Sequence, residues 1–180
     1  VQGLMAAERR RRETGEGGLV QLALSDTAFA TLSHLGYVAE AEINGENRPK
    51  TGNHVFGSYA QDFETEDGRR VMVTAFTARH WQVLVKVTNT AAEMRKIEET
   101  LSLDLRLEEN RYAARNQITD IFRKWFKRYD FATVSSKLGE AGACWGPYQS
   151  VAEAVSEDPR LSTNSPLFDE IDQPGIGRHR

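Results

Sequence analysis

Apolar residues in this chain recur mainly at the spacing of α-helices. This spacing predicts helices over residues 78–87, 91–101 and 108–129. The longest of these carries its apolar side chains on one face: Tyr112, Ile118, Ile121, Phe122, Trp125 and Phe126. Shorter helices are predicted at residues 4–12, 25–43, 130–139 and 151–156. Helices should therefore make up most of the structure.

A smaller part of the chain has the pattern of β-strands. Residues 63–65 and 70–76 flank the dipeptide Asp67-Gly68, which is typical of a hairpin closed by a tight primed turn. Short strands are also predicted at residues 19–24, 143–145 and 167–171, the last at a sheet edge. Helices and hairpin strands together indicate a mixed α/β fold.

Composition narrows the class of protein. The chain has 180 residues, a formal net charge of −3 and 39% hydrophobic residues, which fits one soluble domain or one domain with pieces of another. The mild acidity argues against a nucleic-acid binder. No apolar run approaches the roughly 18 residues needed to span a bilayer, and there is no secretory signal. The single cysteine, Cys144, excludes an internal disulfide and suits a reducing compartment, so we expect a cytoplasmic protein without membrane partners.

Both ends of the sequence predict a piece of a longer chain. The first residues read as a helix already under way, with no capping residue before it, and residues 173–180 have turn chemistry without a natural finish. The basic run at residues 8–12 is followed by Glu13 and Glu16 and contains no aromatic residue. We interpret it as a solvated helix end, where cations suit the helix dipole, and not as a nucleic-acid patch.

Most candidate chemistry has a structural explanation. Cys144 stands between Ala143 and Trp145, which predicts a buried, unreactive thiol. No histidine lies at ligand spacing from another His, Cys or carboxylate, so no metal site is expected. The carboxylates near the hairpin are expected to be solvated: Asp62, Glu64, Glu66 and Asp67.

The loop at residues 52–59 is the one suggestive candidate site. Its glycines, Gly52 and Gly57, allow the backbone to approach a ligand closely. Asn53, Ser58 and Tyr59 add neutral hydrogen-bonding groups. Such a loop either faces a ligand or is only a turn, and the residues alone leave both readings open.

At these same positions the sequence resembles the class III CoA-transferases, the formyl-CoA and carnitine-CoA transferase type. The segment ERRRRETGEGGLVQLALSD resembles the family's R-x-x-T-G-x-G-Q turn, with Gly18 where Gln is usual. The segment RPKTGN resembles the family's R-x-G-N motif, and FETEDGRRVMV resembles its F-x-T-x-D-G strand pair. The segment AGACWGPYQSVAEAVSEDPRL resembles its A-G-x-P-x-G-P-V motif. The Glu-Pro of the racemase branch is replaced by Thr77-Ala78.

The resemblance implies a domain organisation and a partner. Residues 1–44 would end a large Rossmann-like domain and its connecting helix. Residues 45–146 would form most of a small domain, and residues 147–180 would begin the return to the large domain. The complete protein would be an interlocked homodimer acting on an acyl-CoA, with coenzyme A as part of the substrate and no other cofactor.

The resemblance also implies a reaction. CoA would move between carboxyl groups through an aspartyl covalent intermediate, and the branch resembled moves it within 2-methylfumaryl-CoA (mesaconyl-CoA). The nucleophilic aspartate would lie before Val1, so no catalytic residue is expected here. The substrate-facing residues would be Gly52, Asn53, Gly57, Ser58 and Tyr59. Two alternatives stay open: an intermolecular CoA-transferase on the same fold, and an inactive fragment that lacks the nucleophile.

Overall fold

The computed structural model describes residues 1–179 and divides the chain into two units. The first unit is Val1–Lys50 and the second begins at Thr51. Within residues 1–179, the first unit contains helices alone, whereas the second combines helices with short antiparallel strands. The predicted mixed α/β class is thereby confirmed.

The first unit contains α1 (Gln2–Thr14), α2 (Leu24–His34) and α3 (Tyr37–Asn44). The basic run lies on α1, where Glu8 accepts hydrogen bonds from Arg11 and Arg12, and Arg9 pairs with Glu13. These pairs join residues three or four positions apart, which face each other on a helix. The run is therefore matched largely by carboxylates of its own helix and of the segment that follows.

Two predictions for the first unit are wrong. Residues 19–23 form no strand, because they have no neighbouring strand to pair with in this unit, and α2 begins at Leu24. The helix expected over residues 25–43 is two helices, separated at Gly36. Gly36 has a φ of 80°, a left-handed conformation that ends α2.

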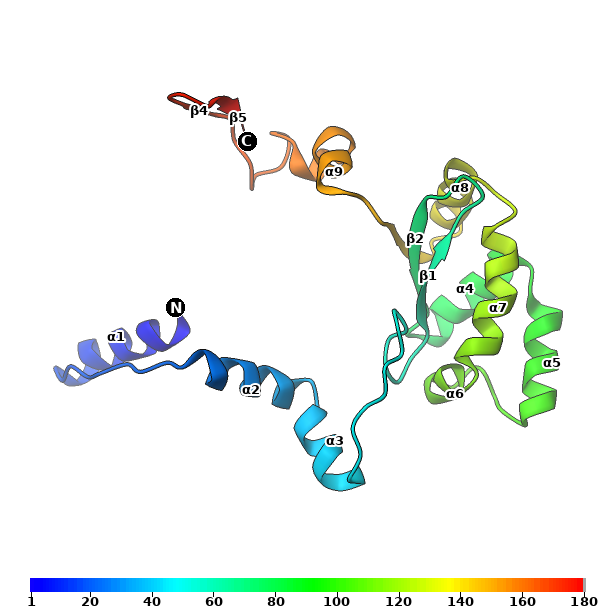
Figure 1. Ribbon diagram of the computed structural model, residues 1–180, viewed down its shortest axis with the longest axis horizontal. Helices are drawn as coiled ribbons and strands as arrows, with labels where there is room; N and C mark the ends of the chain where they lie inside the picture. Colours follow the sequence, from blue (N-terminus) through cyan, green and yellow to red (C-terminus); the bar gives the residue numbers. More distant parts are fainter. Residues whose placement is uncertain (180) are drawn as a thin grey trace. The chain divides into compact units, whose positions relative to one another are not determined.

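The second unit is built on a three-stranded antiparallel sheet of β1 (Ala60–Glu64), β2 (Arg70–Thr74) and β3 (Cys144–Pro147). β2 is the central strand and pairs with both neighbours (Figure 1). Val71 and Val73 alternate with more exposed positions along β2, as expected for a strand with one buried face. The hairpin and the strand near residue 144 are as predicted.

The turn between β1 and β2 is not the primed type that Asp67-Gly68 predicts. Gly68 has a φ of 82°, but Asp67 is absent from the residues with positive φ in the described chain. The Gly68 amide donates to the Thr65 carbonyl (3.1 Å), and the Thr65 amide donates to the Arg69 carbonyl (2.8 Å). This is a type I turn followed by a left-handed glycine, which the longer, five-residue connection allows.

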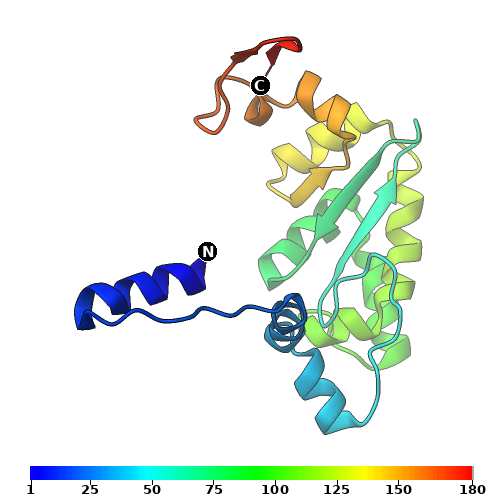
Figure 2. The ribbon, with the colours of Figure 1, turned by 60° about the vertical axis from the view of Figure 1, so that its left-hand side comes forward.

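Helices lie beside this sheet, and Figures 1 and 2 show α7 running along the hairpin. The helices of this part are α4 (Ala78–Thr88), α5 (Ala91–Leu101), α6 (Glu108–Ala113), α7 (Arg115–Phe126) and α8 (Phe131–Glu140). Beyond β3 the chain forms α9 (Val151–Glu157), a 3₁₀ turn (Pro159–Leu161) and the hairpin of β4 (Ile171–Gln173) with β5 (Gly177–His179). The strand predicted at 167–171 is wrong except at Ile171, because its pairing partner is opposite Ile171 and not the residues before it.

The helix predicted over 108–129 is also two helices. It breaks at Ala114, where the sequence has neither Gly nor Pro. Tertiary contacts account for the break: Arg111 turns inward from α6 and is 1% exposed. Its guanidinium donates to the carbonyls of Leu105, Arg106 and Phe76. The two terminal nitrogens of this buried cation are held by three carbonyls, and these contacts fix the direction of α6 independently of the apolar face of α7.

Aromatic side chains form the centre of the core. Phe122 of α7 meets Tyr59, Trp81 and Phe63 edge-to-face, at centroid distances of 5.8, 5.9 and 6.3 Å. Phe63 also stacks on Phe126 at 4.4 Å. Such pairs contribute beyond the area that they bury. The hairpin, α4 and α7 are therefore held together at Phe122.

Replacing Phe122 by Ala should lower the free energy of unfolding by about 3–5 kcal/mol, because it leaves a cavity where three aromatic rings meet. Urea unfolding followed by tryptophan fluorescence measures the change. Tyr148→Ala is the matched control, since Tyr148 is 47% exposed and should change stability by less than about 0.5 kcal/mol. Equal losses for the two variants would contradict this description of the core.

Candidate functional site

The candidate site is the loop of residues 51–59, which leads into β1. Gly52 and Gly57 have φ values of 63° and 77°, so both turns of the loop use conformations that favour glycine. The His54 amide donates to the Thr51 carbonyl and the Val55 amide to the Ala60 carbonyl, both at 3.3 Å. The loop is thus a defined structure with its own hydrogen bonds.

A buried carboxylate ties the loop to the sheet. Asn53 Nδ2 donates to Asp62 Oδ1 at 3.0 Å, across nine residues of sequence. The same oxygen accepts from Gln61 Nε2 at 3.1 Å, and Asp62 Oδ2 accepts from Arg70 of β2. The Asp62 side chain is only 6% exposed. Both carboxylate oxygens are occupied, so Asp62 holds Asn53 in place.

Tyr59, the last residue of the loop, lies in the core. It is fully buried, and its hydroxyl lies 3.1 Å from Thr119 Oγ1 of α7. Burial raises the pKa of Tyr59 far above its usual value. Its carbonyl accepts from the Ala75 amide at 2.8 Å. Of these predicted substrate-facing residues, Tyr59 is therefore buried in the core, whereas Gly52, Asn53 and Gly57 are exposed.

Two buried polar atoms in the loop have no hydrogen-bond partner: Ser58 Oγ and His54 Nδ1. Burial, and then the positive charge of Arg115, lowers the pKa of His54 from its usual value. The folded protein therefore favours the neutral form of this imidazole. Sequence reasoning passed over His54, although its position between Asn53 and Val55 in the loop could have identified it.

The backbone at the second turn is open. A Cβ added to Gly57 would meet no atom within 4 Å. The amides of Gly57 and Ser58 have no acceptor within residues 1–179. Two consecutive N–H groups beside an open position can stabilise negative charge on a ligand oxygen. The loop thus offers uncharged hydrogen-bond donors at a position where no protein atom blocks a ligand.

Other candidate residues have different surroundings from those predicted. Cys144 is exposed and not buried: it is the first residue of β3, and its side chain is not on the face that packs on the core. Asp67 accepts from the Phe131 amide and from Thr65 Oγ1, and Glu64 pairs with Lys127, so these hairpin carboxylates make contacts as well as facing solvent. Among residues 1–179 no group of three His, Cys, Asp or Glu side chains could hold a metal ion. In that same range, no helix is long and apolar enough to cross a membrane.

The sequence of the chain matches one known family of proteins. The family model described as CoA-transferase family III matches residues 1–180, and the chain belongs to this family. It is 41% identical to the 2-methylfumaryl-CoA isomerase of Chloroflexus aurantiacus over 177 residues, which are 98% of this chain and 43% of that protein. It is 28% identical to the succinyl-CoA:mesaconate CoA-transferase of Haloarcula hispanica, covering 96% of this chain and 40% of that protein. The chain thus spans about two-fifths of the length of these relatives.

Solved structures show the same fold. A CAIB/BAIF family protein from Brucella suis matches 98% of this chain and 43% of its own, with a TM-score of 0.68 and 19% identity. Rv3272 from Mycobacterium tuberculosis matches the same shares with a TM-score of 0.70 and 17% identity. At these identities the likeness establishes the fold alone. The predicted family and fold are confirmed.

The lowered pKa of His54 predicts a pH dependence of stability. The neutral imidazole is favoured in the folded state, so the unfolded chain binds the extra proton, and stability should fall as pH drops below about 6.5. NMR titration of the imidazole should give a midpoint below 6.5. Arg115→Gln should raise that midpoint, whereas Arg79→Gln, on the exposed start of α4, should not. A His54 midpoint at or above 6.5 would contradict this account.

Proposed function

We propose that the complete protein moves CoA between the two carboxyl groups of 2-methylfumaryl-CoA, from C1 to C4 of one molecule. The supporting observation is the 41% identity with a 2-methylfumaryl-CoA isomerase across 98% of this chain. The Haloarcula relative's name carries the same acid, since mesaconate is 2-methylfumarate. An unsaturated C5 dicarboxylate is accordingly the proposed acyl group.

The proposed reaction proceeds through an aspartyl intermediate. A carboxylate attacks the thioester carbonyl and CoA leaves as the thiolate, giving a mixed anhydride. The thiolate then attacks the aspartyl carbonyl, releasing the free dicarboxylate and forming an aspartyl-CoA thioester. The other carboxyl of the dicarboxylate reverses these two steps. We do not assign this role to Asp62, because its two oxygens are held by Asn53, Gln61 and Arg70.

The loop supplies the acyl-group contacts in this proposal. The amides of Gly57 and Ser58 would stabilise the negative charge that develops on the acyl oxygen. Gly52 lets the backbone approach, and the Asn53 side-chain oxygen has no partner within residues 1–179. Tyr59 supports the loop from the core, since its hydroxyl is engaged with Thr119.

The remaining expectations concern the complete protein. We propose an interlocked homodimer in the cytoplasm, with CoA entering as part of the substrate. The helices of the first unit support an extensive partner surface, because none of α1, α2 or α3 contains a buried residue in the described structure. The apolar side chains of these three helices are therefore not covered, and large exposed apolar surfaces normally bind another surface.

The amide role of the loop predicts the effect of Gly57→Val. At a φ of 77° a branched residue is strained, so the turn and its two amides should shift. We expect kcat to fall about 100-fold, the usual scale for losing an oxyanion donor. Gly68→Val is the matched control, because it strains a φ of 82° in the hairpin turn. Unchanged kinetics in a folded Gly57→Val enzyme would contradict the assignment.

The reaction type is tested with 2-methylfumaryl-C1-CoA and chromatographic separation of the products. The C4 isomer should form without any added acid, because the acceptor carboxyl belongs to the same molecule. The alternative is intermolecular transfer, in keeping with the name of the Haloarcula relative. Turnover that requires a second carboxylic acid would establish that alternative and overturn the proposed isomerisation.

A further inference from the structure

Arg115 of α7 is a half-buried cation beside the candidate loop. Toward the start of α7, side chains of this helix contact successively earlier residues of β1 and the loop. Lys127, just after the helix, donates to Glu64 at 2.6 Å, and Thr119 lies 3.1 Å from the Tyr59 hydroxyl. Arg115 stands about one helical turn before Thr119 on the same face, so it comes beside the loop residues that precede Tyr59.

Ring contacts support this placement. The Phe56 ring of the loop meets the Tyr112 ring of α6 edge-to-face, at a centroid distance of 5.2 Å. The Arg115 guanidinium carbon lies 4.3 Å from the centroid of the same Tyr112 ring. Arg115 also acts on His54 of the loop, because after burial its positive charge contributes to the lowered pKa of that imidazole. The cation is therefore within electrostatic range of the loop.

No carboxylate within residues 1–179 forms an ion pair with Arg115, whereas Arg123 of the same helix pairs with Asp120. Its Nη1 donates to the Tyr112 carbonyl at 2.8 Å, which leaves the other N–H groups of the planar fork without an acceptor in the described chain. Asp62 does not supply one, since both of its oxygens accept hydrogen bonds from other side chains. A half-buried cation in this state gains free energy from a bound anion.

The loop adds uncharged polar groups. Ser58 is 5% exposed, yet its Oγ has no hydrogen-bond partner within residues 1–179. The same is true of His54 Nδ1 in that part of the chain. A buried hydroxyl normally has a partner, because removing it from water without one is costly. A ligand oxygen beside the loop would satisfy the Ser58 hydroxyl.

We propose that Arg115 binds the second carboxylate of the acyl group, the one not joined to CoA, with Ser58 Oγ as a further donor. The inference rests on the proposed function, because this carboxylate belongs to the proposed dicarboxylate. In 2-methylfumarate a single carbon–carbon double bond separates the carboxyl groups, so the residue that holds the second must lie close to the loop amides that hold the first. The planar guanidinium matches the geometry of a carboxylate. Arg115 thereby selects acyl groups with a charged end.

The test is calorimetric titration of the complete protein with two CoA thioesters. One is 2-methylfumaryl-CoA, and the other is 2-methylcrotonyl-CoA, in which a methyl group replaces the second carboxylate. The parent should bind 2-methylfumaryl-CoA about tenfold more tightly, the scale of one charge-assisted contact. Arg115→Gln should remove this preference by weakening 2-methylfumaryl-CoA alone, and Arg115→Lys, which keeps the charge, should restore part of it. Both positional isomers of 2-methylfumaryl-CoA carry one free carboxylate, so isomerisation during the titration leaves the comparison valid.

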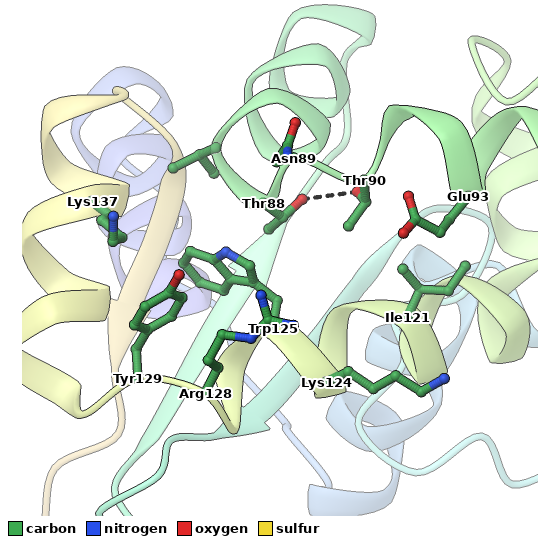
Figure 3. Close-up of a pocket in the computed structure, with 11 residues that line it drawn as sticks. Thr88, Asn89, Thr90, Glu93, Ile121, Lys124, Trp125, Arg128, Tyr129 and Lys137 are labelled. Carbon is green, nitrogen blue, oxygen red and sulfur yellow. Dashed lines mark hydrogen bonds between the residues drawn. The ribbon is translucent and has the colours of Figure 1, made fainter.

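Lys124→Gln is the matched control. Lys124 is an exposed cation of the same helix, and Figure 3 shows it at a separate pocket that Arg128 and Lys137 also line. Its replacement should change neither affinity. Ser58→Ala keeps the backbone amide and removes only the hydroxyl, so it should weaken 2-methylfumaryl-CoA and leave 2-methylcrotonyl-CoA unchanged. Circular dichroism should show unchanged folding in each variant.

Assaying the same proteins for isomerisation separates this inference from the proposed function. A parent that does not isomerise 2-methylfumaryl-CoA, but prefers it in a manner that depends on Arg115, would overturn the proposed reaction and support the carboxylate site. A parent that isomerises it, together with a folded Arg115→Gln protein that keeps the full preference, would overturn the role of Arg115 and leave the reaction standing. Equal affinity of the parent for the two thioesters would also overturn that role.

Discussion

The packing of α7 against the β1–β2 hairpin through Phe122 is the contact on which the second unit depends. Phe122 joins Phe63 of the hairpin, Trp81 of α4 and Tyr59 at the end of the loop in one aromatic cluster. Tyr59 is thereby fixed between the core and the candidate site, with its hydroxyl on Thr119 of the same helix. Because one end of the loop is anchored so firmly, the exposed turn at Gly57 can stay open without losing its shape.

A second tie acts on the other half of the loop. Asp62 belongs to β1, yet it accepts from Asn53, and Arg70 of the neighbouring strand completes its contacts. A carboxylate 6% exposed is costly unless such partners surround it. The loop is thus held near its start by the hydrogen bond from Asn53 to Asp62, and at its end by the aromatic contacts of Tyr59. This arrangement suits a site that presents backbone amides to a ligand, since those amides need rigid support.

The sequence predicted elements well where local chemistry determines them. The helices at Ala78–Thr88 and Ala91–Leu101 follow from apolar spacing, and the hairpin follows from its turn and alternation. The failures have tertiary causes. The break at Ala114 accompanies the inward turn of Arg111, which reaches the distant carbonyl of Phe76, and Cys144 stands on β3 with its side chain off the buried face. Within the site, composition identified the loop, but the burial of Tyr59 depends on Thr119 and Phe122, far along the chain. The contacts of Asp62 depend on how the loop folds back on β1, which the local pattern does not give.

Hydrogen–deuterium exchange of the complete protein, with and without 2-methylfumaryl-CoA, tests the central claim that this loop faces the acyl group. The account predicts that the substrate protects the amides of Gly57 and Ser58, while the already paired amides of β2 change little. Protection elsewhere in the protein, with no change at residues 52–58, would show that the substrate binds and that the loop does not contact it. That result would contradict the account.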